Sequence, residues 1–238
     1  MLRSIRYGEA DRILHLYSAD RGRLNAIAKG ARRPKSRFGG RLEPFFRLDL
    51  MLHEGRSDLL TVTGAATVDG YAALRADGPA IGAATGAADA VLRLFDSTEP
   101  NPPAYRLICR YLEMLDADAG EGDRGAEVIS PASPAAALAF RLKLSLAAGF
   151  TPELGACARC GERGEIAGFS GAAGGVVCSG CEGSGFRISR DAHSFMVSAL
   201  GKPLSELPLV DAPALRQVDR AITDVLSHHA HVRLAPAA

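Results

Sequence analysis

Residues 47–53 read RLDLMLH, with Leu48, Leu50 and Leu52 on one side of the chain and Asp49, Met51 and His53 on the other. This alternation is typical of a strand with one buried face. Two apolar runs precede it, residues 12–18 and 23–28, with the turn signal Ala-Asp-Arg-Gly between them. A run rich in β-forming residues follows at 59–63. Several short strands within about 70 residues predict a small β-barrel or β-sandwich.

After Gly70 the apolar pattern changes to the period of a helix. Helices are expected at about 79–95, 106–115, 133–149, 190–200 and 213–229, with an exposed loop at 116–131. The segment 150–187 is rich in glycine, lacks periodicity and contains four of the five cysteines. The pattern predicts an α+β protein, with a β module followed by a helical module that carries a small cysteine-bearing insertion.

The formal charge of the 238 residues is only +1, but the charge is distributed unevenly. Eight basic residues and no acidic one lie between residues 21 and 41. The other 20 basic residues stand against 27 acidic ones, so the rest of the chain carries a net charge of −7. One basic segment in a mildly acidic chain indicates a polyanionic partner.

No targeting or membrane signal is visible in the sequence. No apolar run approaches the ~20 residues that a membrane span needs, and the N-terminus lacks the apolar region of a signal peptide. An odd number of cysteines, four of them in two close pairs, suits a metal site in a reducing compartment better than a disulfide framework. The expected location is therefore the cytoplasm, without a membrane partner.

The basic segment 29–41 reads KGARRPKSRFGGR. Pro34 and three glycines argue against a regular helix, so its charges are expected on a loop between two strands. Phe38 is a candidate for stacking on a nucleic-acid base. The sequence lacks a helix-turn-helix or basic-zipper pattern, which favours single strands or duplexes bound without sequence preference. The alternative is a charged loop that only contacts water.

The cysteine pairs follow the spacing C-x2-C-x17-C-x2-C, which falls within the range typical of a zinc site. Each pair forms a tight turn that directs two sulfur atoms to one point, and two such turns supply four thiolates. One structural zinc ion is expected on Cys157, Cys160, Cys178 and Cys181. The alternatives are a redox-active dithiol or a degenerate site. Cys109 is interpreted as a packing residue on a helix.

No set of residues suggests a catalytic mechanism. The GxSxG, P-loop, GxGxxG and HExxH patterns do not occur. His228, His229 and His231 are interpreted as the polar end of a helix, and Glu9 and Asp11 as turn and cap residues. The protein is therefore expected not to be an enzyme.

Several motifs together carry a family likeness. They are residues 8–14 (GEADRIL), 22–24 (GRL), 28–33 (AKGARR) and 36–45 (SRFGGRLEPF). This run closely resembles the start of the RecO family of bacterial recombination mediators, and the cysteine pairs lie where many members carry a zinc ribbon. The resemblance implies an N-terminal OB-fold barrel over residues 1–72. It also implies a helical domain over 73–238, with the ribbon inserted at about 153–187.

The resemblance also implies a function in DNA repair and recombination. Members bind single- and double-stranded DNA, anneal complementary strands, and assist the loading of RecA on strands coated by single-strand-binding protein. The partners implied are RecR and the acidic C-terminal tail of the single-strand-binding protein, in a cytoplasmic, nucleoid-associated setting. The basic OB-fold surface contacts DNA in the family, which by matching motif assigns this role to Lys29, Arg32, Arg33, Lys35, Arg37 and Arg41.

The beginning of the chain departs from the family pattern, because members usually carry several more residues before the Leu2-Arg3 motif. We expect either a misassigned start codon or a short first strand. A short strand leaves an open edge in the barrel, with unpaired backbone groups.

Two other functions are consistent with the same residues. An RNA-binding OB-fold and zinc-ribbon protein of translation or transcription would bind matched RNA strands in preference to DNA. A zinc-dependent or thiol enzyme would show turnover or an accessible, reactive cysteine pair.

Overall fold

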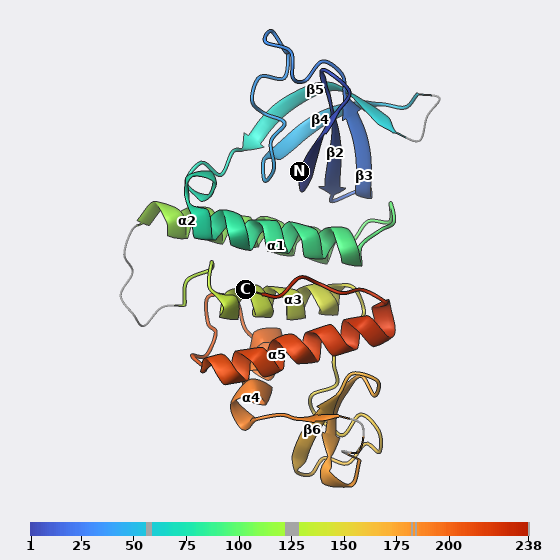
Figure 1. Cartoon of the computed structure of the whole chain (residues 1–238), viewed down its shortest axis with the longest axis vertical. Helices are drawn as coiled ribbons and strands as arrows, with labels where there is room; N and C mark the ends of the chain where they lie inside the picture. Colours follow the sequence, from blue (N-terminus) through green and yellow to red (C-terminus); the bar gives the residue numbers. More distant parts are fainter. Residues whose placement is uncertain (56–58, 122–128, 182, 184, 238) are drawn as a thin grey trace. The chain divides into compact units, whose positions relative to one another are not determined.

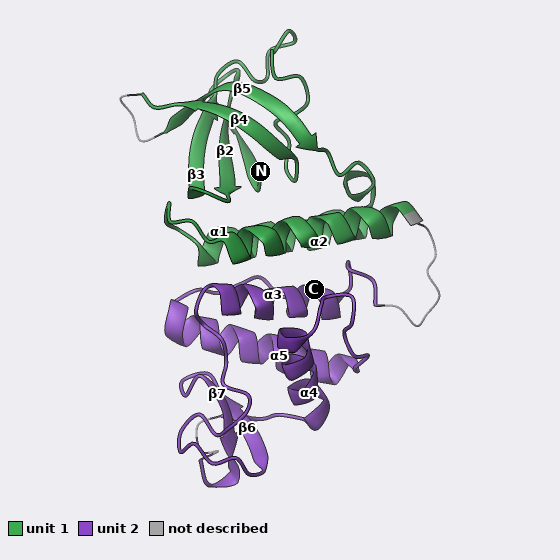
Figure 2. Cartoon of the chain, turned by 180° about the vertical axis from the view of Figure 1, so that it is seen from behind, with its two compact units in different colours: residues 1–122 green, residues 123–238 purple. Residues whose placement is uncertain are grey.

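The computed structural model describes residues 1–55, 59–121, 129–181, 183 and 185–237 (Figure 1). They form two compact units, Met1–Gly122 and Asp123–Ala238 (Figure 2). The first unit contains a five-stranded sheet and two long helices, and the second contains a three-stranded sheet and three helices. No helix in the described part of the chain has both the length and the apolar character needed to cross a membrane.

The sheet of the first unit has the strand order β1-β2-β3-β5-β4. Its strands are β1 (Arg3–Tyr7), β2 (Asp11–Ser18), β3 (Gly22–Ala28), β4 (Arg47–His53) and β5 (Leu60–Asp69). Neighbouring strands are antiparallel except β3 and β5, which are parallel, with Ala26 opposite Leu60. This arrangement is that of the OB-fold, a five-stranded and partly open barrel. The predicted fold of this region is confirmed.

Met1 links the two edge strands of this sheet. Its amine donates a hydrogen bond to the Phe46 carbonyl at 2.7 Å, and the Phe45 N–H donates to the Met1 carbonyl at 2.9 Å. Phe45 and Phe46 lie directly before β4. The five residues of β1 pair with β2, so β1 and β4 remain the edges of the sheet.

The interior of the barrel contains apolar side chains from one face of each strand. Burial alternates residue by residue along β3, and Leu14, Leu24 and Val62 belong to the buried cluster. Phe38 and Leu42, from the loop between β3 and β4, complete this cluster, and Phe38 is only 1% exposed. The expectation that Phe38 is free to stack on a base was therefore wrong, because its ring fills the barrel.

Two helices follow the sheet in the first unit. They are α1 (Gly78–Leu94) and α2 (Pro102–Glu121), after the short 3-10 helix η1 (Leu74–Ala76). The side chains of Asp77 and Asn101 cap the first turns of these two helices by accepting hydrogen bonds from backbone N–H groups.

The prediction of a loop at 116–131 was wrong for residues 116–121, which are helical. Asp116 accepts a hydrogen bond from the Leu74 N–H at 2.9 Å, which ties this last part of α2 to η1. Residues 122–128 lie outside the described residues.

The second unit combines helices with a small sheet. Its helices are α3 (Pro134–Ala147), α4 (Arg190–Gly201) and α5 (Ala212–Val225), the last followed by a π-helical turn at Leu226–Ala230. Each helix begins after a capping side chain: Ser133, Ser189 and Asp211. The sheet has the order β7-β6-β8, with β6 (Ile166–Ser170), β7 (Gly175–Cys178) and β8 (Phe186–Arg187).

The small sheet is fixed to the helices of its own unit. Gly171 approaches α5 so closely that a Cβ atom on it would lie 2.5 Å from the Cβ of Asp224. The Nε2 atom of His229 lies 2.9 Å from the Gly171 carbonyl oxygen and hydrogen-bonds to it. On β8, the guanidinium of Arg220 covers the ring of Phe186 at 4.2 Å.

The two compact units divide after Gly122, because α1 and α2 pack on each other in the first unit. The expected domains, 1–72 and 73–238, divide the chain by secondary-structure type instead. The division into domains 1–72 and 73–238 stays a prediction.

Removal of the Phe38 ring is expected to destabilise the first unit. Phe38→Ala should lower the free energy of unfolding by about 3–5 kcal/mol, since it leaves a cavity in the barrel core. Denaturant unfolding measures the change, with Met51→Ala as the control because Met51 is 70% exposed on β4. If Phe38→Ala lowered the free energy of unfolding by less than about 1 kcal/mol, as substitution of an exposed residue does, the result would contradict the burial of Phe38.

Candidate metal centre and nucleic-acid interface

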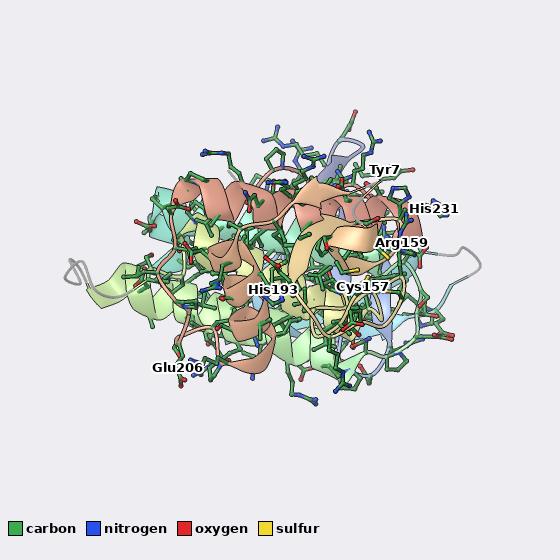
Figure 3. All side chains as sticks on the ribbon, turned by 90° about the horizontal axis from the view of Figure 1, so that it is seen from below. Tyr7, Cys157, Arg159, His193, Glu206 and His231 are labelled. Atoms are coloured by element: carbon green, nitrogen blue, oxygen red, sulfur yellow. The ribbon has the colours of Figure 1, made fainter. Side chains whose placement is uncertain are left out.

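Four cysteines of the second unit lie together, as their spacing predicts. The Sγ atoms of Cys157, Cys160, Cys178 and Cys181 are all within 4.8 Å of one another. Figure 3 shows sulfur atoms gathered near Cys157. The Sγ atoms of Cys160 and Cys178 are 3.7 Å apart. A tetrahedral ion with metal–sulfur bonds of roughly 2.3 Å requires sulfur atoms about 3.8 Å apart. The cluster therefore fits one metal ion bound by four sulfur atoms.

Two turns bring the cysteine pairs together. In the first, the Gly161 N–H donates to the Cys157 carbonyl at 2.8 Å, and Gly161 adopts a φ of 76°, which favours glycine. The second pair begins at the end of β7 and closes in the 3-10 helix η2 (Ser179–Cys181). The Ala158 N–H donates to the Val176 carbonyl at 2.8 Å and so joins the first turn to β7.

The thiols of this cluster affect one another's ionisation. Backbone N–H groups of Cys178 and Cys160 lower the pKa of the Cys157 thiol to about 6. Hydrogen bonds with the Cys160 and Cys178 thiols raise the pKa of Cys181 to about 12. Four thiolates this close together repel one another, so their joint ionisation requires a cation. Four sulfur ligands close a tetrahedral shell, which is the arrangement of a structural metal site.

The basic segment forms an ordered loop between β3 and β4. Hydrogen bonds three residues apart define successive turns: Arg33 N–H to Gly30 carbonyl at 3.1 Å, Ser36 to Arg33 at 3.0 Å, and Gly39 to Ser36 at 3.2 Å. Gly30 and Gly39 have positive φ angles, of 68° and 55°. The path is not a regular helix, as its proline and glycines predict.

Six basic side chains of this loop are exposed: Lys29, Arg32, Arg33, Lys35, Arg37 and Arg41. In the part of the chain that the structure describes, none of them forms an ion pair. Other arginines of the same unit do, such as Arg12 with Glu43 at 2.7 Å and Arg21 with Glu54 at 2.9 Å. The loop thus presents cations that no described carboxylate pairs with, a suitable surface for phosphate groups.

Backbone carbonyls hold three of these arginine side chains in place through hydrogen bonds. The guanidinium groups of Arg32, Arg37 and Arg41 donate to the carbonyls of Glu9 at 3.2 Å, Val62 at 3.3 Å and Phe38 at 3.4 Å. Arg37 also lies over the ring of Phe38, 4.9 Å from its centroid. Phe38 therefore supports the loop from inside the barrel.

The sequence reasoning missed the exposed apolar side chains of β1. Ile5 is 44% exposed and Tyr7 is 53% exposed, and both belong to the outer surface of the sheet. The sequence analysis allowed a short first strand here but gave it neither bounds nor an exposed face. The alternation of Ile5 and Tyr7 with polar neighbours is the signal that indicates a strand.

Comparison with known proteins assigns both parts of the chain. The family model described as Recombination protein O N terminal matches residues 1–71, and that described as Recombination protein O C terminal matches residues 75–235. The chain belongs to the RecO family. The DNA repair protein RecO of Rubrobacter xylanophilus is 38% identical over 235 residues, which cover 96% of this chain and 88% of that protein. The DNA repair protein RecO of Anaeromyxobacter sp. strain K is 36% identical over 250 residues, 99% of this chain and 91% of that protein.

The RecO relatives support a function in DNA repair and recombination. A further relative, from Cutibacterium acnes, is 37% identical over 187 residues, 78% of this chain and 73% of that protein, and is also named DNA repair protein RecO. The resemblance found in the sequence is thereby confirmed.

The cysteine cluster is expected to retain one metal ion per chain through purification. Cys157→Ser and Cys178→Ser should lose the ion, because each removes one of four ligands, and loss of the ion should unfold the ribbon. Elemental analysis of the purified proteins measures the metal content. The matched control is Cys109→Ser, which removes the fifth cysteine, on α2 and outside the cluster, and should retain the ion. Metal-free wild-type protein would contradict the assignment.

Proposed function

We propose that this protein is a non-catalytic mediator of DNA repair and recombination. It binds single- and double-stranded DNA, anneals complementary strands, and assists the loading of RecA on strands coated by single-strand-binding protein, together with RecR. The observation that carries the proposal is the loop between β3 and β4, where six exposed cations have no ion-pair partner among the described residues. Membership of the RecO family supports the same function.

Annealing is attributed to the positive charge of this loop. Two DNA strands repel each other through their phosphates, and binding by lysine and arginine releases the counterions condensed on each strand. Lys29, Arg32, Arg33, Lys35, Arg37 and Arg41 are the proposed contacts. Because none of them has a carboxylate partner among the described residues, they bind phosphates without first breaking an ion pair. Phosphate contacts carry no sequence information, which suits a protein that acts on any strand.

The metal ion is proposed to be a single zinc ion with a structural role. Four cysteine ligands in a tetrahedral set favour zinc, and zinc supplies folding free energy to a ribbon of short strands. A closed shell leaves no position for a substrate, so the proposal assigns no catalysis to this site. The proposed partners are DNA, RecR and the acidic tail of the single-strand-binding protein, in the cytoplasm and at the nucleoid.

The test of this proposal is single-stranded DNA binding across a salt series. Arg32→Ala/Arg33→Ala should weaken binding and make the log–log salt dependence shallower, by about 0.7 for each phosphate that the variant no longer binds. Arg106→Ala/Arg110→Ala is the matched control, because it removes two exposed arginines of α2, outside the loop. Fluorescence anisotropy with a labelled oligonucleotide measures both quantities.

Binding that is absent, or insensitive to salt, would refute the proposal. Equal effects of the two arginine pairs would also refute it, because the loop would then have no special role. A matched RNA strand in the same assay separates a DNA mediator from an RNA-binding protein, since the latter would prefer the RNA.

A further inference from the structure

The turn between β6 and β7 is held by a histidine that follows α5. This turn is closed by the Gly174 N–H, which donates to the Gly171 carbonyl at 3.0 Å. The Nε2 atom of His229 donates to the same carbonyl at 2.9 Å. Gly174, at a φ of 79°, lies so close to the histidine ring that a Cβ atom on it would be 3.4 Å from Nε2. One side chain outside the ribbon therefore fits against both ends of the turn.

Backbone hydrogen bonds connect this turn to the cysteine cluster. The Glu153 N–H donates to the Gly174 carbonyl at 2.9 Å, and the Val176 N–H donates to the Glu153 carbonyl at 2.9 Å. The Ala158 N–H, inside the first cysteine pair, donates to the Val176 carbonyl at 2.8 Å. Strand β7 itself ends at Cys178, the first cysteine of the second pair. Both pairs are thus joined through β7 to the turn that His229 contacts.

His229 belongs to the π-helical turn Leu226–Ala230 at the end of α5. Turns of this type are rare and lie frequently at functional sites. His231, directly after it, has a φ of 55°, which is uncommon for a residue other than glycine and redirects the chain. The Val232 N–H then donates to the Leu226 carbonyl at 3.1 Å. The backbone on both sides of His229 is therefore held in one path.

The segment that follows, residues 231–237, covers a buried arginine of α3. Figure 1 shows this segment running back along the helix. Arg141 is only 5% exposed, and its guanidinium donates to the Pro236 carbonyl at 3.4 Å. It also forms an ion pair with Asp219 of α5 at 3.3 Å. The segment 231–237 thus contributes to shielding Arg141 from solvent.

We propose that the metal ion of the ribbon fixes the segment 231–237 on α3, so that the ribbon acts as a metal-dependent clasp. With the ion bound, the turn between β6 and β7 is ordered and His229 holds the π-helical turn against it. Without the ion, the cysteine side chains no longer hold their two turns together, and the turn that His229 contacts loses its support. The segment then leaves α3, and Arg141 becomes accessible. The inference rests on the proposed metal site and is independent of DNA binding.

Amide hydrogen exchange of the full chain, measured by mass spectrometry, tests the clasp. Removal of the ion by a chelator should speed exchange in peptides that cover residues 226–235, which include the bonded Val232 amide. His229→Ala should do the same in metal-loaded protein, by at least about fivefold, the change expected for the loss of one net hydrogen bond. This variant should retain its ion, because His229 lies outside the cysteine cluster. Chelation of His229→Ala should add no further change at 226–235, since the clasp is already open.

The matched control is His228→Ala. It removes the neighbouring, exposed histidine of the same turn and should leave exchange at 226–235 as in the wild type. Phenylglyoxal, which modifies accessible arginines, reports on Arg141 in the same samples. It should label Arg141 in metal-free wild type and in His229→Ala, but not in metal-loaded wild type.

Unchanged exchange at 226–235 in metal-loaded His229→Ala, or an Arg141 that stays unlabelled in this variant, would overturn the proposal. If chelation unfolds the whole second unit, the metal-loaded variant decides alone. Wild-type protein that holds no metal would overturn both the clasp and the metal assignment. Metal-loaded protein whose exchange at 226–235 does not respond to chelation would overturn only the clasp. DNA binding by the basic loop is tested separately by the salt series.

Discussion

The burial of Phe38 and Leu42 in the barrel determines where the positive charge of the first unit lies. These two side chains hold a loop of charged residues, which would otherwise sample many conformations, against the core. With the loop fixed, its cations cannot enter the apolar interior and have no ion-pair partner among the described carboxylates, so they remain in solvent. A loop that is already ordered loses less conformational entropy when it binds a ligand. More of the interaction free energy therefore contributes to affinity.

A separate constraint shapes the second unit. Strands as short as Phe186–Arg187 bury too little surface to fold on an apolar core alone, although Phe169 and Val176 are fully buried between the sheet and its surroundings. The proposed ion, joined to four sulfur ligands, would supply the missing stabilisation. The two units thus differ in what they present. The barrel carries the exposed positive charge, whereas the ribbon carries the four-cysteine cluster and a mixed surface charge from residues such as Arg159 and Glu162.

Local features of the sequence predicted most of the fold. The strand Arg47–His53 has the predicted bounds, because strict alternation defines both ends, and the cysteine cluster follows from spacing alone. Long-range features were not predictable in the same way. The burial of Phe38 depends on strands distant in sequence, and the helical residues 116–121 include Asp116, which accepts a hydrogen bond from the distant Leu74 N–H. Ile5, Ile13 and Ile27 lie side by side because of the register of three strands, which periodicity within one strand does not specify.

The most direct test of DNA binding by the barrel measures amide hydrogen exchange by mass spectrometry. The full chain is compared with and without oligothymidylate. We expect DNA to slow amide exchange in peptides that cover residues 29–41 and in those that cover β1 and β2, and to leave the ribbon at 153–187 unchanged. Protection confined to the ribbon or to the helices of the second unit, with none in the basic loop, would contradict the assignment of DNA binding to the barrel.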